Sequence, residues 1–268
     1  MTQVPARVSV TVRDVRGADE LRACQDLQRR AWGITEDGYV VPVATMAAAQ
    51  RVGGLILGAF DANGALVGFA FAFLGKLDER LLLWSQLTGV HPAHQSTGVG
   101  RLLKFEQRRR AHEMGLDAVA WAFDPMQASN AAFNLGVLGA TCRVYEPDMY
   151  GSRSDALNVG LATDRLIAEW ATSGVTGGRT SPWPDAIELV TTRDGEVGMV
   201  ESITPHTPHL QIEIPPRISE VKSRTSVAHQ WQAAVRAAFQ SAFAAGYVSV
   251  GFTRADPSRP RYLLELRR

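Results

Sequence analysis

The sequence has little of what marks a disulfide-bonded, metal-binding or membrane-spanning protein. Its 268 residues include only two cysteines, Cys24 and Cys142, which are too few for a disulfide framework and lack the paired spacing of a zinc site or a redox dithiol. Residues 1–12 contain no apolar stretch typical of a signal peptide, and no later run approaches the roughly 18 uncharged apolar residues of a membrane span. We therefore expect no bound metal, no membrane partner and a cytoplasmic location.

An excess of charge of either sign is also missing. The chain has 28 Lys and Arg against 27 Asp and Glu, a formal net charge of +1, so no overall field attracts nucleic acid. Arg108, Arg109 and Arg110 form a basic cluster without interleaved aromatic residues, which favours a solvent-facing helix surface. We expect no nucleic-acid partner, and any anionic ligand must be bound locally.

Hydrophobic residues make up 46% of the chain and charged residues 21%, as in an ordinary globular protein. The patterning predicts a mixed α/β fold. Residues 61–64 predict a tight turn between two strands, and the apolar run 80–90 is typical of a buried central strand. Residues 33–50 give no clear pattern. The predicted strands are 8–12, 55–60, 66–73, 80–90, 118–123 and 144–150, and the predicted helices begin at Asp19, Gln95 and Ser129.

The last hundred residues form a separate region in the sequence. Residues 173–182 are small and polar, as in a linker or exposed loop. Beyond them, Trp231, Val235, Ala238, Phe239 and Ala242 form an apolar stripe on a predicted helix, 229–245. We expect an N-terminal domain at 1–172, a linker at 173–183 and a C-terminal α/β region at 184–268, either a small second domain or an extension of the first sheet. Its predicted strands are 187–191, 197–201, 210–214, 247–253 and 261–266.

The clearest chemical signal follows the predicted central strand. In the segment 90–101, Gly98 and Gly100 lie where a tight loop turns into a helix. Unpaired backbone N–H groups at a helix N-terminus hold phosphate groups, and glycine allows close approach. The segment matches neither the P-loop nor the Rossmann glycine pattern. These residues therefore predict a diphosphate-bearing ligand, which leaves a nucleotide, a dinucleotide and coenzyme A open.

The segment 95–100, Gln-Ser-Thr-Gly-Val-Gly, preceded by Val90 and Pro92, resembles the acyl-CoA loop of the GNAT superfamily of N-acyltransferases. That loop has Gln or Arg, two variable residues, Gly, one variable residue, and Gly or Ala. The resemblance extends over about residues 8–170. The segment 121–125, Trp-Ala-Phe-Asp-Pro, together with the added C-terminal region, resembles a less common subgroup.

The resemblance implies a central twisted mixed sheet flanked by helices, with a smaller α/β region at the C-terminus. It also implies acetyl-CoA or another short acyl-CoA as co-substrate, with the central strand splayed from its neighbour so that the pantetheine arm lies alongside it. Arg101 and Lys104 are expected either to meet the outer phosphates or to lie on a solvated helix face. The residues implied in cofactor binding are Leu87, Thr88, Val90, Gln95, Ser96, Thr97, Gly98, Val99, Gly100, Arg101, Asn130 and Asn134.

The catalytic groups depart from the family pattern. Many members carry a Glu on the central strand as a base, where this chain has Ser85 and Gln86, and a Tyr acid on the second helix, where this chain has Leu135. Proximity in sequence leaves three catalytic candidates: Tyr145, Asp124 and Ser129. His91 and His94 flank the loop and are expected to be structural or exposed.

The resemblance implies transfer of an acetyl group, or another short acyl group such as succinyl, to a primary amine of a small metabolite such as an amino acid. The alternative is a non-catalytic acyl-CoA sensor, which the missing Glu and Tyr favour. The C-terminal region could cover the acceptor pocket, form a homodimer, or be a degenerate second copy of the fold.

Overall fold

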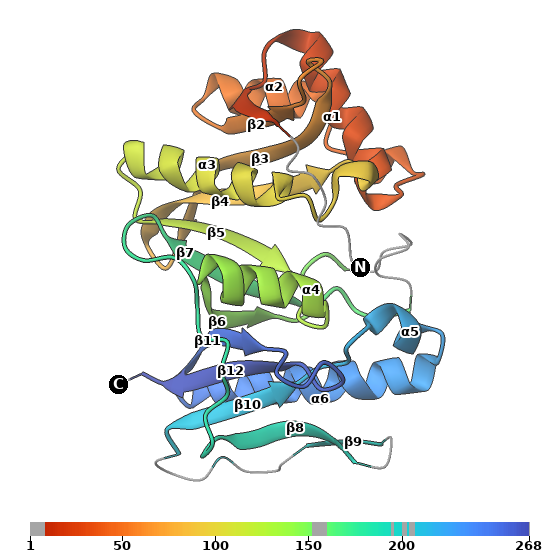
Figure 1. The fold of residues 1–268 in the computed structure, drawn as a ribbon, viewed down its shortest axis with the longest axis vertical. Helices are drawn as coiled ribbons and strands as arrows, with labels where there is room; N and C mark the ends of the chain where they lie inside the picture. Colours follow the sequence, from red (N-terminus) through yellow and green to blue (C-terminus); the bar gives the residue numbers. More distant parts are fainter. Residues whose placement is uncertain (1–8, 152–159, 194–195, 200–202, 204–206, 268) are drawn as a thin grey trace. The chain divides into compact units, whose positions relative to one another are not determined.

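The computed structural model describes residues 9–151, 160–193, 196–199, 203 and 207–267. Their contacts divide the chain into two compact units. The first holds the described residues up to Trp121 and residues 171–173, and the second holds the others. The chain passes from one unit to the other within strand β5 (Ala118–Phe123), which is labelled in Figure 1.

The first unit is built on a mixed sheet. Its strands lie in the order β1 (Thr11–Asp14), β2 (Leu55–Phe60), β3 (Leu66–Leu77), β4 (Arg80–Val90) and β5. Neighbours from β1 to β4 are antiparallel, whereas β4 and β5 are parallel. The predicted mixed α/β class, the hairpin at 61–64 and the central strand at 80–90 are confirmed.

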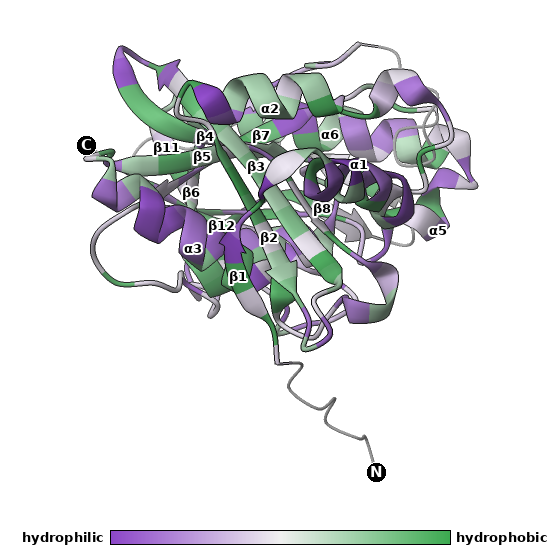
Figure 2. Ribbon diagram, turned by 90° about the horizontal axis from the view of Figure 1, so that it is seen from above, coloured by the Kyte–Doolittle hydropathy of each residue, from purple (hydrophilic) through white to green (hydrophobic). Residues whose placement is uncertain are grey.

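Helices cover both faces of this sheet. The side chains of β3 point alternately to the two faces, so they contact helices on both sides. Phe69 and Phe71 pack with α1 (Gly17–Trp32) and α2 (Val43–Arg51), the helix within the stretch that the sequence left open. Gly68 faces the other way, where a Cβ would come within 2.7 Å of Val99 of helix α3 (Val99–Glu113). In Figure 2, β2 and β3 are mostly green, whereas α1 and α3 carry purple polar faces.

The second unit contains helical turns, a mixed sheet and one long helix. Its strands lie in the order β7-β6-β11-β12-β10-β8-β9, with β8 and β10 parallel. The elements are α4 (Ala128–Ala131), the π-helical segment η3 (Ala132–Leu138), β6 (Thr141–Glu146), β7 (Arg165–Ala171), β8 (Ile187–Arg193), β9 (Glu196–Met199), β10 (His209–Glu213), α5 (Ile218–Lys222), α6 (Thr225–Ala244), β11 (Tyr247–Thr253) and β12 (Arg261–Leu266).

Helix α6 supplies the core of the second unit. The five residues of its predicted apolar stripe are all buried, which confirms that part of the sequence prediction. The Phe239 ring stacks on Tyr145 with the centroids 5.7 Å apart and meets Tyr262 edge-on at 5.0 Å. Aromatic pairs at such distances add to the stability gained from burial.

Several element boundaries differ from the prediction. The first strand occupies 11–14 rather than 8–12, and the helix expected from Gln95 begins at Val99. Strand β7 had no sequence prediction. The predicted strands 8–12 and 197–201 include Val8, Val200 and Glu201, which lie outside the described residues.

The compact units also divide the chain at a different place from the expected linker at 173–183. Residues 122–151 belong with the C-terminal strands, because β6 pairs with β11 at Cys142 and Ser249. Arg179, within the expected linker, forms a β-bridge with Gly251. The small and polar residues at 173–183 are therefore not a free linker, because part of this segment pairs with a strand of the second unit.

Gly139 provides a test of the packing in the second unit. Its φ is +79°, and an added Cβ would lie 2.8 Å from backbone atoms of Gly177. Gly139→Ala should therefore lower the free energy of unfolding by about 2–4 kcal/mol, through left-handed strain plus the clash. Gly174 is the matched control, because its φ is +82° with open space around an added Cβ. In urea unfolding, Gly174→Ala should cost only about 1 kcal/mol; equal losses in the two variants would contradict the clash.

Candidate active site

Strand β4 loses its pairing with β5 halfway along its length. On one side β4 pairs with β3 from Arg80 to Val90, with a bulge at Gln86. On the other side, the ladder with β5 contains only the pairs Leu83 with Val119 and Trp84 with Ala120, among the residues that the structure describes. From Ser85 onward the two strands part, which confirms the expected splay. Peptide groups on this edge of β4 can therefore pair with an added extended chain.

The loop at the end of β4 presents a helix N-terminus. Ser96 and Gly98 have positive φ angles of +63° and +95°, and Gly98 is the N-cap of α3. No side chain caps the helix, and its first turn has no acidic residue. The first α-helical bond runs from Leu102 N–H to the Gly98 carbonyl at 3.0 Å, so the N–H groups of the preceding turn have no helical acceptor. This geometry suits an anion.

Other loop residues hold its shape. The Gln95 side chain donates to the Val90 carbonyl at 3.3 Å, and the Thr97 hydroxyl donates to the His94 carbonyl at 2.6 Å. An added Cβ at Gly98 would meet no atom within 4 Å, which leaves the approach to the amides open. The residues present thus fit the diphosphate of coenzyme A. In the described part of the chain, no cluster of three or more His, Cys, Asp or Glu residues suits a metal ion.

The remaining cofactor candidates lie in different environments. Leu87 packs with the α1 side of the sheet, whereas Thr88 has a buried hydroxyl oxygen without a hydrogen-bond partner. Arg101 is exposed, with its guanidinium 5.3 Å from the Phe105 ring centroid. Asn130 and Asn134 belong to the second unit, the first exposed and the second buried. Their contacts with a cofactor stay predictions.

The three catalytic candidates all lie in the second unit. The Tyr145 hydroxyl donates to Asp164 at 2.7 Å, and Arg236 forms two hydrogen bonds to the same carboxylate. Burial, and then the bond to Asp164, raise the pKa of Tyr145. Burial also raises the pKa of Asp124, which accepts from Met126 N–H at 2.8 Å. Ser129 is exposed on α4. The catalytic roles of all three stay predictions.

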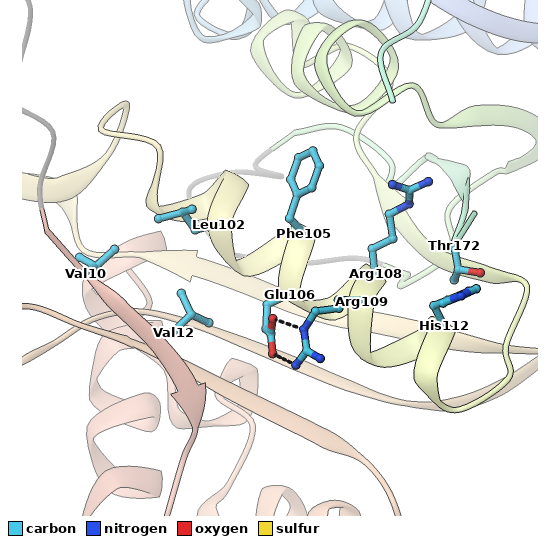
Figure 3. Close-up of a pocket in the computed structure, with 9 residues that line it drawn as sticks. All are labelled: Val10, Val12, Leu102, Phe105, Glu106, Arg108, Arg109, His112 and Thr172. Carbon is cyan, nitrogen blue, oxygen red and sulfur yellow. Dashed lines mark hydrogen bonds and ion pairs between the residues drawn. The ribbon is translucent and has the colours of Figure 1, made fainter. Parts of the chain in front are cut away.

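A surface hollow of about 590 Å³ lies between β1 and the outward face of α3. Figure 3 shows Leu102 and Phe105 beside the Glu106–Arg109 ion pair, with Val10 and Val12 across from them. Of the described residues that line the hollow, none is a predicted cofactor or catalytic residue. We therefore place the candidate site at the loop and the splayed edge of β4.

A buried polar cluster lies between α3 and β4, where the sequence predicted none. Lys104 is 5% exposed, and its Nζ donates to the Ser85 hydroxyl at 2.9 Å. Ser85 donates in turn to Gln107 Oε1 at 3.0 Å, and Nζ lies 3.8 Å from the Trp121 ring centroid. Burial lowers the pKa of Lys104 to about 7. Neither expectation for Lys104, the outer phosphates or the solvated face, describes this position.

Helical spacing could have identified Lys104. The buried residues of α3 include Val99, Leu103, Gln107 and Ala111, which recur every four residues. Position 104 lies beside that stripe, one residue after Leu103, on the face that packs on the sheet. A lysine at a core-facing position is rare enough to be informative.

The lowered pKa of Lys104 makes stability depend on pH. Between about pH 7 and the ordinary lysine pKa of 10.5, the unfolded chain binds a proton that the folded protein has lost. The free energy of unfolding should therefore rise with pH in this window, by at most about 1.4 kcal/mol per pH unit from this group. Lys104→Met should flatten the rise, measured by urea unfolding from pH 6 to 10. Lys76→Met, at an exposed lysine, should keep the wild-type slope; parallel slopes for all three proteins would contradict the buried-lysine assignment.

Tyr145 allows a second test. Tyr145→Phe removes a hydrogen bond to the carboxylate of Asp164, so it should lower the free energy of unfolding by about 1–3 kcal/mol. Arg236 continues to pair with Asp164 in this variant, which keeps the loss moderate. Thermal unfolding of the purified variant measures the change, and an unchanged midpoint would contradict a structural role for the hydroxyl.

Comparison with known proteins gives similarity in structure only. No protein-family model matches the sequence, and no curated protein matches it. Similar solved structures include yncA of Salmonella typhimurium, which contains its cofactor acetyl-CoA, with 20% identity over 65% of this chain and 99% of that one and a TM-score of 0.47. A GNAT-superfamily phosphinothricin acetyltransferase from Sinorhizobium meliloti in complex with acetyl-CoA has 20% identity over 60% of this chain and 88% of that one, with a TM-score of 0.48. The NatC complex bound to Gag peptide and CoA has 8% identity over 61% and 98%, with a TM-score of 0.47.

No helix among the described residues has the length and apolar character needed to cross a bilayer. The similar structures named above include an enzyme named for a small acceptor and a complex with a bound peptide. At these identities and TM-scores, they do not assign an activity or an acceptor to this chain. An assignment has to come from the loop, the splayed strand and the residues around them.

Proposed function

We propose that this chain is a GNAT-type N-acyltransferase that moves an acetyl or other short acyl group from acyl-CoA to a primary amine of a small metabolite. The observation that carries the proposal is the combination of a splayed β4 edge with an uncapped helix N-terminus at its end. The β4–β5 ladder stops at Trp84 and Ala120, while Gly98 begins α3. The open edge of β4 could pair with the extended pantetheine arm of coenzyme A, and the backbone amides at the start of α3 could bind its diphosphate.

The loop is the proposed diphosphate site. The first turn of α3 contains the backbone N–H groups of Val99, Gly100 and Arg101. The helix dipole favours negative charge at this end. The absence of an acidic residue in that turn removes a competing anion. Arg101, which is exposed in the first turn of α3, is the proposed cation for an outer phosphate.

The edge of β4 is the proposed site for the pantetheine arm. From Ser85 to Val90 the strand spans about 17 Å at about 3.3 Å per residue, comparable with an extended phosphopantetheine arm. Amides of such an arm pair with strand peptide groups as in β-strand addition. Bound acyl-CoA supplies a thioester whose carbonyl carbon is the electrophile. A β4 N–H near the start of the open edge would polarise that carbonyl as negative charge develops on its oxygen.

The acceptor is a primary amine, which attacks in its neutral form. Holding the amine beside the thioester contributes most of the rate enhancement in this scheme, since orientation turns a two-molecule reaction into a local one. We propose a small metabolite such as an amino acid as the acceptor. We propose both acetyl-CoA and succinyl-CoA as donors. A succinyl group would also require a cation near the acyl end to bind its second carboxylate.

A non-catalytic acyl-CoA sensor is the second candidate. Ser85 stands on the central strand where many GNAT members carry a Glu, and Ser85 is buried against Gln107. A sensor would bind acyl-CoA through the same loop and strand edge without releasing thiol. Thiol release in the presence of amines therefore separates the two functions.

Gly98→Trp tests the proposed site. The indole would occupy the open space over the α3 amides, so acetyl-CoA binding should weaken by about 100-fold or more, equivalent to about 2.7 kcal/mol. Calorimetry measures binding. Thiol release with acetyl-CoA or succinyl-CoA, against pools of amino acids, polyamines and short peptides, measures transfer and identifies the acceptor class.

The matched control is Gly64→Trp in the β2–β3 turn. Gly64 has a φ of +79° with open space around an added Cβ, so it carries similar backbone strain away from the loop. This variant should keep wild-type binding and thiol release. Tight binding by the wild type with no release in any pool would favour the sensor. Unimpaired acetyl-CoA binding by Gly98→Trp would remove the loop from the proposed site.

A further inference from the structure

Lys104 lies at the narrow end of the opening between β4 and β5. The last paired residues of the two strands are Trp84 and Ala120, and the next residues along them are Ser85 and Trp121. Lys104 Nζ contacts both, 2.9 Å from the Ser85 hydroxyl and 3.8 Å from the Trp121 ring centroid. The ammonium group therefore lies where the strands begin to part, at the opposite end of the β4 edge from the diphosphate loop.

Among the described residues, Nζ contacts polar groups but forms no ion pair with an acidic side chain. The strand residues that Nζ contacts, Ser85 and Trp121, do not titrate near neutral pH. On α3, one turn to either side, Arg101 is exposed and Arg108 donates to the carbonyls of Ala171 and Ser173. Glu106 is paired with Arg109 and Arg110.

The cluster also keeps an unused hydrogen-bond donor. Gln107 is fully buried, and its Oε1 accepts from Ser85, but its Nε2 has no hydrogen-bond partner among the described residues. A buried amide nitrogen without an acceptor is costly, by about 1–3 kcal/mol. A ligand atom with a lone pair or negative charge at this end of the opening would satisfy it. Two donors, Lys104 Nζ and Gln107 Nε2, thus belong to one buried cluster.

The choice of lysine is itself informative in this chain. Only three of its 28 basic residues are lysine, namely Lys76, Lys104 and Lys222. Arginine stays protonated in any protein environment, whereas a buried lysine amine can lose and regain its proton near neutral pH. The chain thus has an amine with exchangeable charge where arginine would hold a fixed one.

We propose that Lys104 is the general acid of the transferase, which protonates the departing thiolate of coenzyme A, with Ser85 and Gln107 as its positioning residues. This inference rests on the proposed function. As the acceptor nitrogen bonds to the acyl carbon and the carbon–sulfur bond breaks, the electron pair stays on sulfur. Lys104 donates an Nζ proton to that sulfur and becomes neutral. The proton released by the acceptor nitrogen then restores the ammonium, so an amide and a free thiol form with no net proton uptake.

The acidity of the groups agrees with this direction of transfer. Burial lowers the pKa of Lys104 to about 7, and an alkyl thiol has a pKa of about 8.5. Proton transfer from the ammonium to the thiolate is therefore downhill. An acid with a pKa near the working pH is also the most effective, because it is partly protonated and transfers readily. Tyr145, one of the three candidates from the sequence, has its hydroxyl bonded to Asp164 instead.

The first experiment compares wild type with Lys104→Met and Lys104→Arg in thiol release from pH 6 to 9. The acceptor is a weakly basic amine that stays neutral over this range. Wild-type turnover should fall as pH rises above about 7, since Lys104 must be protonated to act. Lys104→Met should lose about 100-fold in turnover, within the usual range for general acids, and lose this pH dependence. Its dissociation constant for acetyl-CoA should change by less than about 3-fold. Lys76→Met is the control and should match wild type.

The second experiment follows the lysine directly and does not depend on turnover. With three lysines, isotope-labelled protein gives few amine resonances, and Lys104→Arg identifies the one from Lys104. Coenzyme A should shift the Lys104 resonance and its titration midpoint upward, because a nearby sulfur that gains negative charge favours the ammonium. Desulfo-coenzyme A, which lacks the thiol, should bind and leave the midpoint unchanged. This measurement on wild type also applies if Lys104→Met fails to fold.

The outcomes separate this inference from the proposed function. Wild-type turnover and pH dependence in folded Lys104→Met, or equal midpoints with the two coenzymes, would leave the transferase standing and make Lys104 a structural lysine. No thiol release by wild type with any amine would overturn the transferase and this role together. Loss of acetyl-CoA binding in Lys104→Met, in place of a loss of turnover, would also overturn the role as acid.

Discussion

The separation of β4 from β5 after Trp84 is the constraint on which the candidate site depends. A strand between two neighbours has its peptide groups paired on both sides, and unpaired buried groups are costly. Here β4 keeps its pairing with β3 to Val90, with a bulge at Gln86, whereas among the described residues its pairing with β5 ends at Trp84 and Ala120. The bulge alters the twist of β4 at the place where the strands part. An extended ligand is the natural partner for the edge that results.

A buried lysine also lies beside this separation, between α3 and β4. Ser85 and Trp121, which follow the last paired residues of the two strands, offer a hydroxyl and a ring face to Nζ. Burial still disfavours the charged form of Lys104, so the ammonium group is less stable here than in water. Such arrangements reduce stability and are typical of places where proton transfer occurs.

The extent to which the sequence predicts this structure follows from how local each signal is. The turn at 61–64, the strand at 80–90 and the stripe on α6 depend on neighbouring residues, and all three were predicted. The tight turn into α3 was also predicted, and Gly98 has a φ of +95° there, whereas diphosphate binding by this loop stays a prediction. The departure of β4 from β5 could be anticipated only through the family resemblance. The Lys104 cluster joins residues 19 to 22 positions apart across two elements, and no local pattern reports such a contact. The division into domains was the hardest feature to predict from the sequence, because β6 pairs with β11 through Cys142 and Ser249, which are far apart along the chain.

The charge balance of the whole chain agrees with a site made of backbone groups. A protein that held a diphosphate through side-chain cations would need a basic patch. The formal net charge of this chain is only +1. Three arginines farther along α3 are already engaged: Arg109 and Arg110 with Glu106, and Arg108 with backbone carbonyls. The α3 amides supply partial positive charge at fixed positions without long flexible side chains to order. At the proposed diphosphate site, affinity would depend on loop geometry rather than on net charge, and so it should be less sensitive to salt than affinity at an exposed cluster of cations.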